Sequence, residues 1–239
     1  MRVYRSEIRL IQISVILAVI VLIVAIVARP VSEPPVVAPP DPGPSASLEG
    51  DNETPPEDEL ANTKIVCLGD SYTFGYPATN QDTSWPKYLG DALKVEVINA
   101  GKVHQNASDL VKRFDSDVAA HNPGRVIILA GIGDAIRNIP LETFQADIIT
   151  LIKKAEANHI QPILALPFSF PDKKTLEFIA QYREWEKSYA QEKSILLLDF
   201  QSILFDDKGV MKSQYVAKEG YPNADGYKAM AEYAASILK

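Results

Sequence analysis

Short apolar runs alternate with longer amphipathic stretches from residue 64 to the end of the chain. The third amphipathic stretch has the clearest helical spacing, because its apolar residues recur every three or four positions. The apolar runs predict five buried strands, at Ile65–Leu68, Val95–Ile98, Val126–Ala130, Pro162–Leu166 and Ile195–Leu198. The amphipathic stretches predict helices at about 84–93, 107–121, 141–158, 173–192 and 223–238.

This alternation of strands and helices indicates an α/β fold. Strands joined through helices take right-handed crossovers, and they build a parallel sheet that is covered on both faces. Ligands of such sheets bind at the carboxyl ends of the strands, near the point where the strand order reverses. We therefore expect functional residues in the loops that follow the strands, at 69–77, 99–106, 131–140 and 199–222.

A different pattern occurs near the N-terminus. Residues 10–28 form a run of nineteen residues in which only Gln12 and Ser14 are polar. As a helix this run spans close to 30 Å, about the thickness of the hydrocarbon core of a bilayer. A cleaved signal peptide is the alternative, but its apolar region is usually shorter, about 7–15 residues. The sequence favours a single transmembrane anchor within residues 1–29.

Charge near this apolar run predicts its orientation. Arginines crowd the short N-terminal side of the run, so the positive-inside rule places the N-terminus in the cytoplasm and the rest of the chain outside the cell. The expected location is therefore the cell membrane, with the membrane bound through residues 10–28. Residues 30–63 follow, with nine prolines, eight acidic residues and no Lys or Arg. Such a segment predicts a disordered, extended linker before a single domain at 64–239.

The folded part is nearly neutral. The whole chain has a formal net charge of −7, to which residues 1–29 contribute +3 and residues 30–63 contribute −8, so residues 64–239 carry −2. The sequence has no basic stripe that would indicate nucleic-acid binding. Cys67 is the only cysteine, so no intramolecular disulfide can form. The expected extracytoplasmic location therefore depends on the apolar run and its arginines.

The first expected loop contains a candidate nucleophile. Gly69-Asp70-Ser71 comes directly after the first predicted strand, near the start of a helix. Backbone N–H groups point outward at such a place, which suits a serine whose attack creates an oxyanion. An ordinary turn is the alternative interpretation, because Gly, Asp and Ser are common turn residues.

The motifs along the domain resemble those of the SGNH (GDSL) hydrolase superfamily, especially its lysophospholipase and thioesterase branch. The matching segments run in the family's order and are Gly69-Asp70-Ser71, Trp85-Pro86, Val97–Gly101, Val126–Gly131 and Pro222–Tyr227. The resemblance implies a three-layer, flavodoxin-like fold with strand order 2-1-3-4-5. It also implies ester hydrolysis with neither a metal nor another cofactor.

The resemblance assigns roles to single residues of the first three loops. Ser71 matches the nucleophile. Gly101, His104, Gly133 and Asp134 fall in the oxyanion and pocket region. His104 stands where the family has an oxyanion glycine, so only its backbone N–H can donate there. Gly133 stands where the family has an oxyanion asparagine, and this exchange should widen the groove beside the serine.

The last motif departs furthest from the family pattern. Lys218 and Tyr221 occupy the positions of the catalytic Asp and His. A serine hydroxyl is a weak nucleophile without a base, and a tyrosine with a pKa of about 10 is almost entirely protonated at neutral pH. We therefore expect a weakly active or inactive domain that binds an acyl, ester or glycan ligand at the cell envelope. An active esterase or deacetylase with His104 as its base and an envelope scaffold protein are the alternatives. The ligand and the oligomeric state stay open.

Overall fold

The computed structural model describes residues 62–217 and 220–239. The expected membrane anchor, nearly all of the expected linker and Lys218 lie outside the described residues. In the ranges that are described, no helix is both long enough and apolar enough to cross a bilayer.

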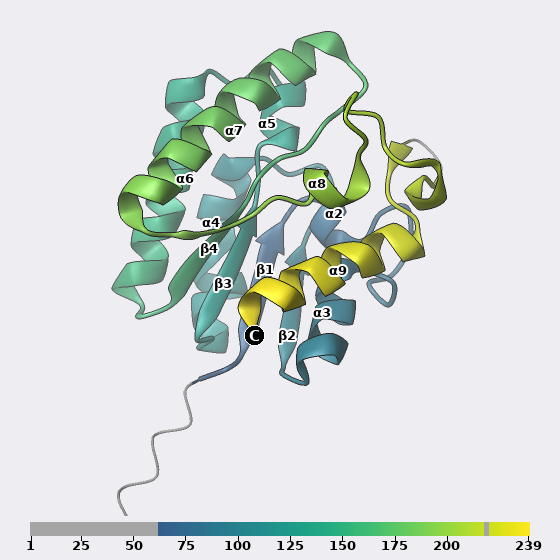
Figure 1. Ribbon diagram of the computed structural model, residues 1–239. Helices are drawn as coiled ribbons and strands as arrows, with labels where there is room; N and C mark the ends of the chain where they lie inside the picture. The colour runs from purple at the N-terminus through teal and green to yellow at the C-terminus, as the bar shows by residue number, and fades with distance from the viewer. Residues whose placement is uncertain (1–61, 218–219) are drawn as a thin grey trace, which may run out of the picture. The chain divides into compact units, whose positions relative to one another are not determined.

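The centre of the domain is a five-stranded sheet (Figure 1). Its strands are β1 (Ile65–Gly69), β2 (Val97–Gly101), β3 (Arg125–Leu129), β4 (Gln161–Ala165) and β5 (Leu196–Leu198). They lie in the order β2-β1-β3-β4-β5, and every neighbouring pair is parallel. The expected α/β class and strand order are therefore confirmed.

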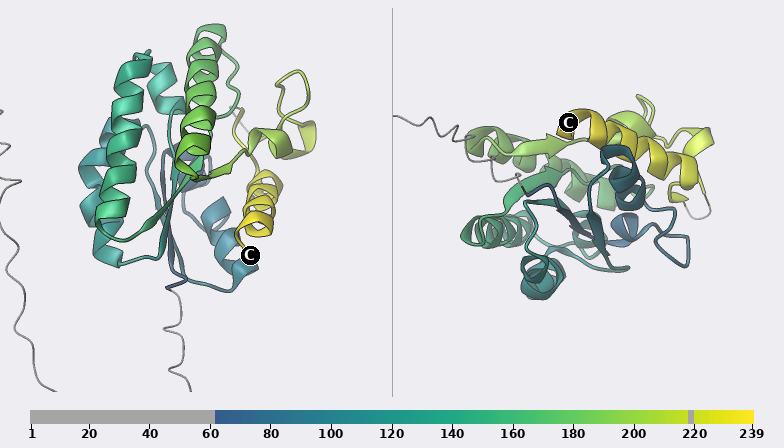
Figure 2. Two further views of the ribbon diagram at one scale, coloured as in Figure 1. Left: turned by 60° about the vertical axis from the view of Figure 1, so that its left-hand side comes forward. Right: turned by 90° about the horizontal axis from the view of Figure 1, so that it is seen from below.

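Helices cover both faces of this sheet, as Figure 2 shows. One face is covered by α3 (Trp85–Leu93), α8 (Gln201–Leu204) and α9 (Ala224–Leu238). The other is covered by α4 (Ala107–Asp117), α6 (Leu141–Ala157) and α7 (Lys173–Lys193). Because strand side chains alternate between faces, Ile65 and Cys67 join the first core while Val66 and Leu68 join the second. The buried face of α6 carries the residues that its spacing predicted, Phe144, Ile148, Leu151, Ile152 and Ala155.

The boundaries of a few elements differ from the prediction. Strand β2 begins at Val97 instead of Val95, because the left-handed Lys94 (φ 60°) ends α3 and the chain needs two more residues to reach the sheet. The described part also contains short helices outside the predicted ranges, α5 (Ile132–Ile136), α8 and η2 (Ser213–Tyr215). The helix expected to start near Ser71 is the short α2 (Ser71–Phe74), and the helix predicted at 107–121 is divided into α4 and η1 (Ala119–His121). The helices outside the predicted ranges are too short to produce a helical period in the sequence.

Two glycines let the first loop sit tightly over the carboxyl edge of the sheet. A Cβ atom on Gly101 would lie 2.1 Å from the backbone nitrogen of Phe74. A Cβ atom on Gly69 would lie 2.2 Å from Oγ1 of Thr73. Helix α2 can therefore rest directly on the ends of β1 and β2 only because these residues have no side chain.

Candidate functional site

Ser71 is the first residue of α2, directly above the end of β1. The carboxylate of Asp70 caps this helix by accepting a hydrogen bond from the Tyr72 backbone at 2.9 Å. Ser71 itself is 7% exposed, and its Oγ accepts a hydrogen bond from the backbone N–H of His104 at 3.2 Å. The contact that was expected between these two loops is therefore present, in the form of a backbone donor aimed at the serine oxygen.

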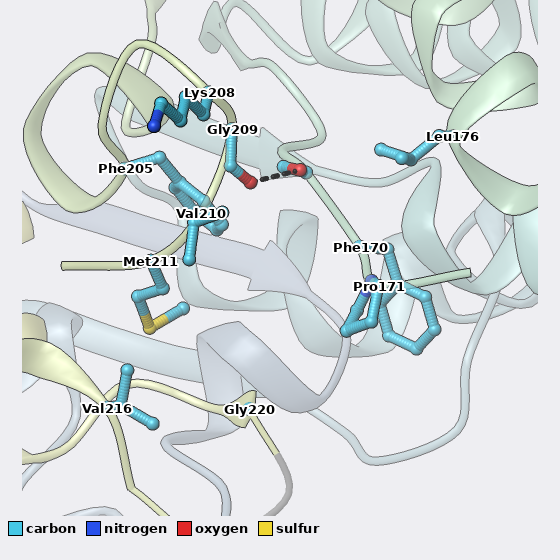
Figure 3. A pocket seen from close by; sticks show the side chains of 11 residues that line it. Phe170, Pro171, Leu176, Phe205, Lys208, Gly209, Val210, Met211, Val216 and Gly220 are labelled. Atoms are coloured by element: carbon cyan, nitrogen blue, oxygen red, sulfur yellow. Dashed lines mark hydrogen bonds between the residues drawn. The ribbon is translucent and has the colours of Figure 1, made fainter. Parts of the chain in front are cut away.

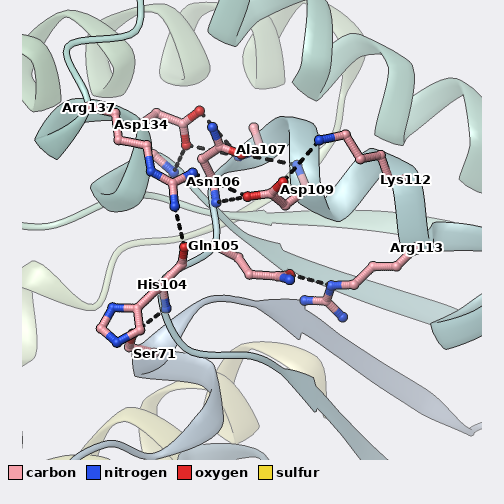
Figure 4. A network of polar contacts seen from close by, with 11 residues as sticks. Ser71, His104, Gln105, Asn106, Ala107, Asp109, Lys112, Arg113, Asp134 and Arg137 are labelled. Atoms are coloured by element: carbon pink, nitrogen blue, oxygen red, sulfur yellow. Dashed lines mark hydrogen bonds and ion pairs between the residues drawn. The ribbon is translucent and has the colours of Figure 1, made fainter.

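His104 adopts a left-handed conformation, with φ of 61°. This conformation favours glycine, the residue that the family resemblance expects at this position. The guanidinium of Arg137, just after α5, donates to the His104 carbonyl (Figure 4). The imidazole is exposed, and within the described residues it forms no hydrogen bond with Ser71 Oγ.

A buried arginine holds the loop that carries His104. Arg113, on α4, donates to the carbonyl oxygens of Gly69 at 2.9 Å and Ala100 at 2.7 Å, which belong to the ends of β1 and β2. Its Nε donates to the side chain of Gln105 at 2.5 Å, and its guanidinium also contacts Asp117 at 2.8 Å. Arg113 therefore ties the serine loop to the His104 loop. The family resemblance did not point to this residue.

The start of α4 provides a second support for the same loop. Asn106 and Asp109 form a capping box, in which each side chain accepts from the other's backbone N–H. Arg137 extends this network by contacting Asp109 at 3.2 Å. Since the same guanidinium also holds the His104 carbonyl, α4 and α5 jointly fix the segment that points the His104 N–H at Ser71.

Gly133 does not open a groove beside the serine, so that prediction is wrong. A Cβ atom on Gly133 would lie 2.1 Å from the carbonyl oxygen of Gln105. The His104 loop thus occupies the space that an asparagine side chain would need. The sequence could not show this, because the contact joins two loops that are 28 positions apart (133 − 105 = 28).

Asp134 is a buried brace between loops, and it is fully shielded from solvent. Its carboxylate accepts hydrogen bonds from the backbone N–H groups of Ala107, at 3.0 Å, and Gly131, at 3.2 Å. Burial raises the pKa of Asp134 to about 6, and these two hydrogen bonds oppose the rise. Asp134 therefore holds the two loops of the site together through their backbone and lines no surface that a ligand could reach.

Burial also perturbs the acid next to the serine. It raises the pKa of Asp70 to about 7, against the opposing hydrogen bond from the Tyr72 backbone, and the charge of Asp134 adds to the rise. The Asp70 side chain is 5% exposed and is engaged in capping α2. The structure therefore gives it a role in holding the serine loop.

Tyr221 packs against the loop that carries the serine. The next residue, Pro222, forms an isolated antiparallel bridge with Val216. The ring centroid of Tyr221 lies 4.7 Å from that of Tyr72, the residue after Ser71, and 4.5 Å from that of Tyr76. The last motif therefore reaches the serine loop as expected, but it arrives there as part of an aromatic cluster. Lys218 itself lies outside the described residues.

The family comparison matches most of this domain. Residues 67–229 match the model of the GDSL-like Lipase/Acylhydrolase family. No curated protein matches the chain. Among solved structures, a lipolytic protein of the G-D-S-L family from Desulfitobacterium hafniense DCB-2 is 52% identical, with a TM-score of 0.71. The match covers 74% of this chain and 99% of that chain, so the solved chain of that relative consists almost entirely of this domain.

More distant solved structures share the fold. The psychrotrophic esterase EstA from Pseudoalteromonas sp. is 20% identical with a TM-score of 0.62, and the match covers 74% of this chain and 96% of that one. An acetylxylan esterase from Geobacillus stearothermophilus, solved as a catalytic mutant, is 21% identical with a TM-score of 0.63, covering 74% and 94%.

Proposed function

The chain belongs to the GDSL-like lipase/acylhydrolase family, and on that premise we propose that its domain binds an acyl, ester or glycan ligand with little or no turnover. One observation carries this proposal. The Tyr221 ring packs against Tyr72 and Tyr76 where the family resemblance leads us to expect the imidazole of the base. A phenol with an ordinary pKa of about 10 does not take a proton from a serine at neutral pH.

The contact between Ser71 and His104 supports the binding part of the proposal. Ser71 Oγ and the backbone N–H of His104 are 3.2 Å apart, so both can face the carbonyl of a ligand. When a member of the catalytic triad is removed, serine hydrolases still accelerate the reaction by only about 10³–10⁴-fold over water. An ester that binds here would therefore be retained far longer than it would be in an active relative.

We place the domain outside the cell, held to the membrane by residues 10–28. The apolar run of nineteen residues and the arginines before it support this part of the proposal. Protease treatment of intact, wall-stripped cells should release the domain by cutting in residues 30–63. Protection of the domain in intact cells would contradict the orientation, and a mature N-terminus near residue 29 would indicate a cleaved signal peptide.

An active esterase with His104 as its base is the second candidate. It is favoured by the fact that the backbone of His104 contacts the serine oxygen, which puts its imidazole on the same rim. His104→Gly separates the two roles of this residue, because glycine accepts the left-handed backbone and keeps the N–H donor while the imidazole is lost.

A fluorophosphonate probe tests the proposal, because it reacts with activated serines. We expect the domain and its Ser71→Ala variant to be labelled equally slowly. Rapid labelling that is lost in Ser71→Ala would contradict the proposal. If that labelling were also lost in His104→Gly, the second candidate would be supported; if it persisted, another base would be acting.

A further inference from the structure

A cavity of about 390 Å³ opens at the carboxyl edge of the sheet, on the Tyr221 side (Figure 3). It lies among the segment after β4, the first turn of α7 and the segments after β5. Its lining is mainly apolar and includes Phe170, Pro171, Leu176, Phe205, Val210 and Met211. This volume and lining are typical of sites for small organic ligands.

The cavity adjoins the aromatic cluster beside the serine. Gly220, at its edge, directly precedes Tyr221. On its inner side the ring of Phe205 lies 5.7 Å from that of Phe168, which in turn lies 4.6 Å from the ring of Tyr72. Two successive aromatic rings, Phe205 and Phe168, therefore connect the cavity wall to the residue that follows Ser71.

Ser169, the one hydroxyl-bearing residue among the described residues that line the cavity, already has hydrogen-bond partners. Ser169 Oγ donates to the carbonyl of Gly209 at 2.8 Å, and its backbone N–H donates to the side chain of Gln201 at 3.1 Å. A sugar placed here would lose hydrogen bonds to water and find few replacements, at a cost in free energy. The wall therefore favours an apolar occupant over a glycan.

Exposed apolar side chains gather around this cavity. The described residues include six large hydrophobic side chains that are clearly exposed, and three of them line it. Leu176 is 36% exposed, Val216 41% and Val210 59%. A hydrocarbon chain that covered them would remove apolar surface from water, which stabilises a complex.

One charged side chain, Lys208, belongs to the lining. It sits in a turn in which the Asp206 carboxylate accepts from the backbone N–H groups of Lys208 and Val210, both at 2.9 Å. Asp206 is thus engaged with the backbone, and Lys208 forms no ion pair with any residue in the described part of the chain. The long, flexible side chain of Lys208 could bring an ammonium group to the mouth of the cavity, which suits a chain that ends in an anion.

We propose that this cavity binds a free fatty acid, with its chain against Leu176, Val210 and Val216 and its carboxylate near Lys208. The inference goes beyond the proposed function, because the cavity lies on the Tyr221 side of the edge, outside the contact between Ser71 and His104. A free fatty acid also has no ester bond that the domain could hydrolyse.

Displacement of a fluorescent fatty acid, dansylaminoundecanoate, from residues 62–239 tests the proposal. We expect octanoate, dodecanoate and hexadecanoate to compete, and Leu176→Trp and Val210→Trp to weaken dodecanoate binding by at least roughly tenfold by filling the cavity. Leu196→Trp is the matched control, because Leu196 is 37% exposed at the start of β5 and lies outside the cavity lining. Thermal unfolding of each variant checks that it is folded; Val210, in an exposed turn, should tolerate the exchange even if Leu176 does not.

Removing the charge of Lys208 tests where the carboxylate of the fatty acid binds. Lys208→Ala should weaken dodecanoate several-fold and leave dodecanol unchanged, whereas Lys153→Ala, an exposed change on α6, should alter neither. Equal binding of dodecanoate by Leu196→Trp and both cavity-filling variants would overturn the proposal, and so would displacement of the probe by xylohexaose but by no fatty acid. Neither result depends on Ser71, so a failure here is distinct from a failure of the proposed function, which would appear as Ser71-dependent hydrolysis.

Discussion

The two sides of the carboxyl edge differ in how much aromatic and apolar packing joins their loops. On the serine side, the loops after β1, β2 and β3 are joined by hydrogen bonds from Arg113 and Arg137, and by backbone N–H groups that donate to Asp134. On the Tyr221 side, the loops after β4 and β5 are also joined by hydrogen bonds, from Ser169 and Arg183, but ring contacts and the apolar lining of a cavity add to them. In our account, Ser71 and the His104 N–H can still hold a carbonyl oxygen. On the other side, the Tyr221 ring stands where a base would accept the serine proton, and it serves as a packing surface.

Removing Arg113 should break the serine side and have the largest effect. Arg113→Ala removes a buried donor from the carbonyls of Gly69 and Ala100 and from the Asp117 carboxylate. The Gly69 carbonyl and Asp117 keep the hydrogen bonds that they accept from Lys102. We expect a loss of about 3–5 kcal/mol in the free energy of unfolding, measured by urea denaturation. Lys87→Ala removes an exposed ion pair and should cost less than about 1 kcal/mol. Equal losses in the two variants would show that the network does not hold the loops.

The buried acids of the serine side should make stability depend on pH. The pKa of Asp70 rises to about 7 in the folded state, from 3.8, so over that window the folded domain binds more protons than the unfolded chain. Stability contributed by neutral Asp70 is therefore present at low pH and is lost as pH rises towards 7, by on the order of 1 kcal/mol per pH unit. Asp134, with a pKa of about 6, acts in the same direction up to pH 6.

Asp70→Asn isolates this effect, because asparagine can still cap α2. Its stability should fall less steeply than that of the wild type between pH 4 and pH 7 in urea titrations. Asp91→Asn, on the exposed side of α3, is the control. Parallel pH profiles for Asp70→Asn and the wild type would mean that Asp70 is ionised normally in the fold.

A side chain at Gly133 should loosen the contact between the loops. Gly133→Ala puts a Cβ atom 2.1 Å from the Gln105 carbonyl, which must move, and we expect about 1–3 kcal/mol of destabilisation. Amide exchange at His104 should rise as its hydrogen bond to Ser71 is disturbed. Gly220→Ala is the comparison on the Tyr221 side: a Cβ atom there meets nothing within 4 Å, so only its φ of 78° opposes the exchange. Unchanged exchange at His104 would argue against our account of the loop.

The smallest effect should come from Tyr221→Phe, which separates the contribution of the Tyr221 ring from that of its hydroxyl group. If the ring serves as packing, Tyr221→Phe keeps the contacts with Tyr72 and Tyr76 and changes the free energy of unfolding by less than about 1 kcal/mol. Tyr221→Ala removes both contacts and should cost about 1–3 kcal/mol. If the phenylalanine variant proved as unstable as the alanine variant, the hydroxyl would be the important group and the packing account would be wrong.

Most of the fold was predictable, because buried parallel strands and amphipathic helices leave strong periods in a sequence. All five strands were found, and β2 was misplaced by two residues because the left-handed Lys94 delays its start. The α5 and α8 helices were missed since four or five residues contain hardly more than one turn. The expected anchor and linker stay predictions.

The candidate site was predicted less completely. Motif positions brought Ser71, His104 and Tyr221 to one edge, where contacts link their loops. The supporting arginines were missed because their partners are backbone carbonyls, which no sequence motif records. Arg113 did leave one signal: it falls on the apolar face of α4, beside Leu110 and Phe114, where an arginine needs buried partners.

The central claim is that the domain keeps a site for the ligand but lacks the base that activates the serine. The most direct test is the rate of p-nitrophenyl butyrate hydrolysis by residues 62–239 and by the Ser71→Ala variant. Our account predicts the same slow rate for both proteins, close to that of buffer. A turnover on the order of 1 s⁻¹ or more that disappears in Ser71→Ala would contradict it.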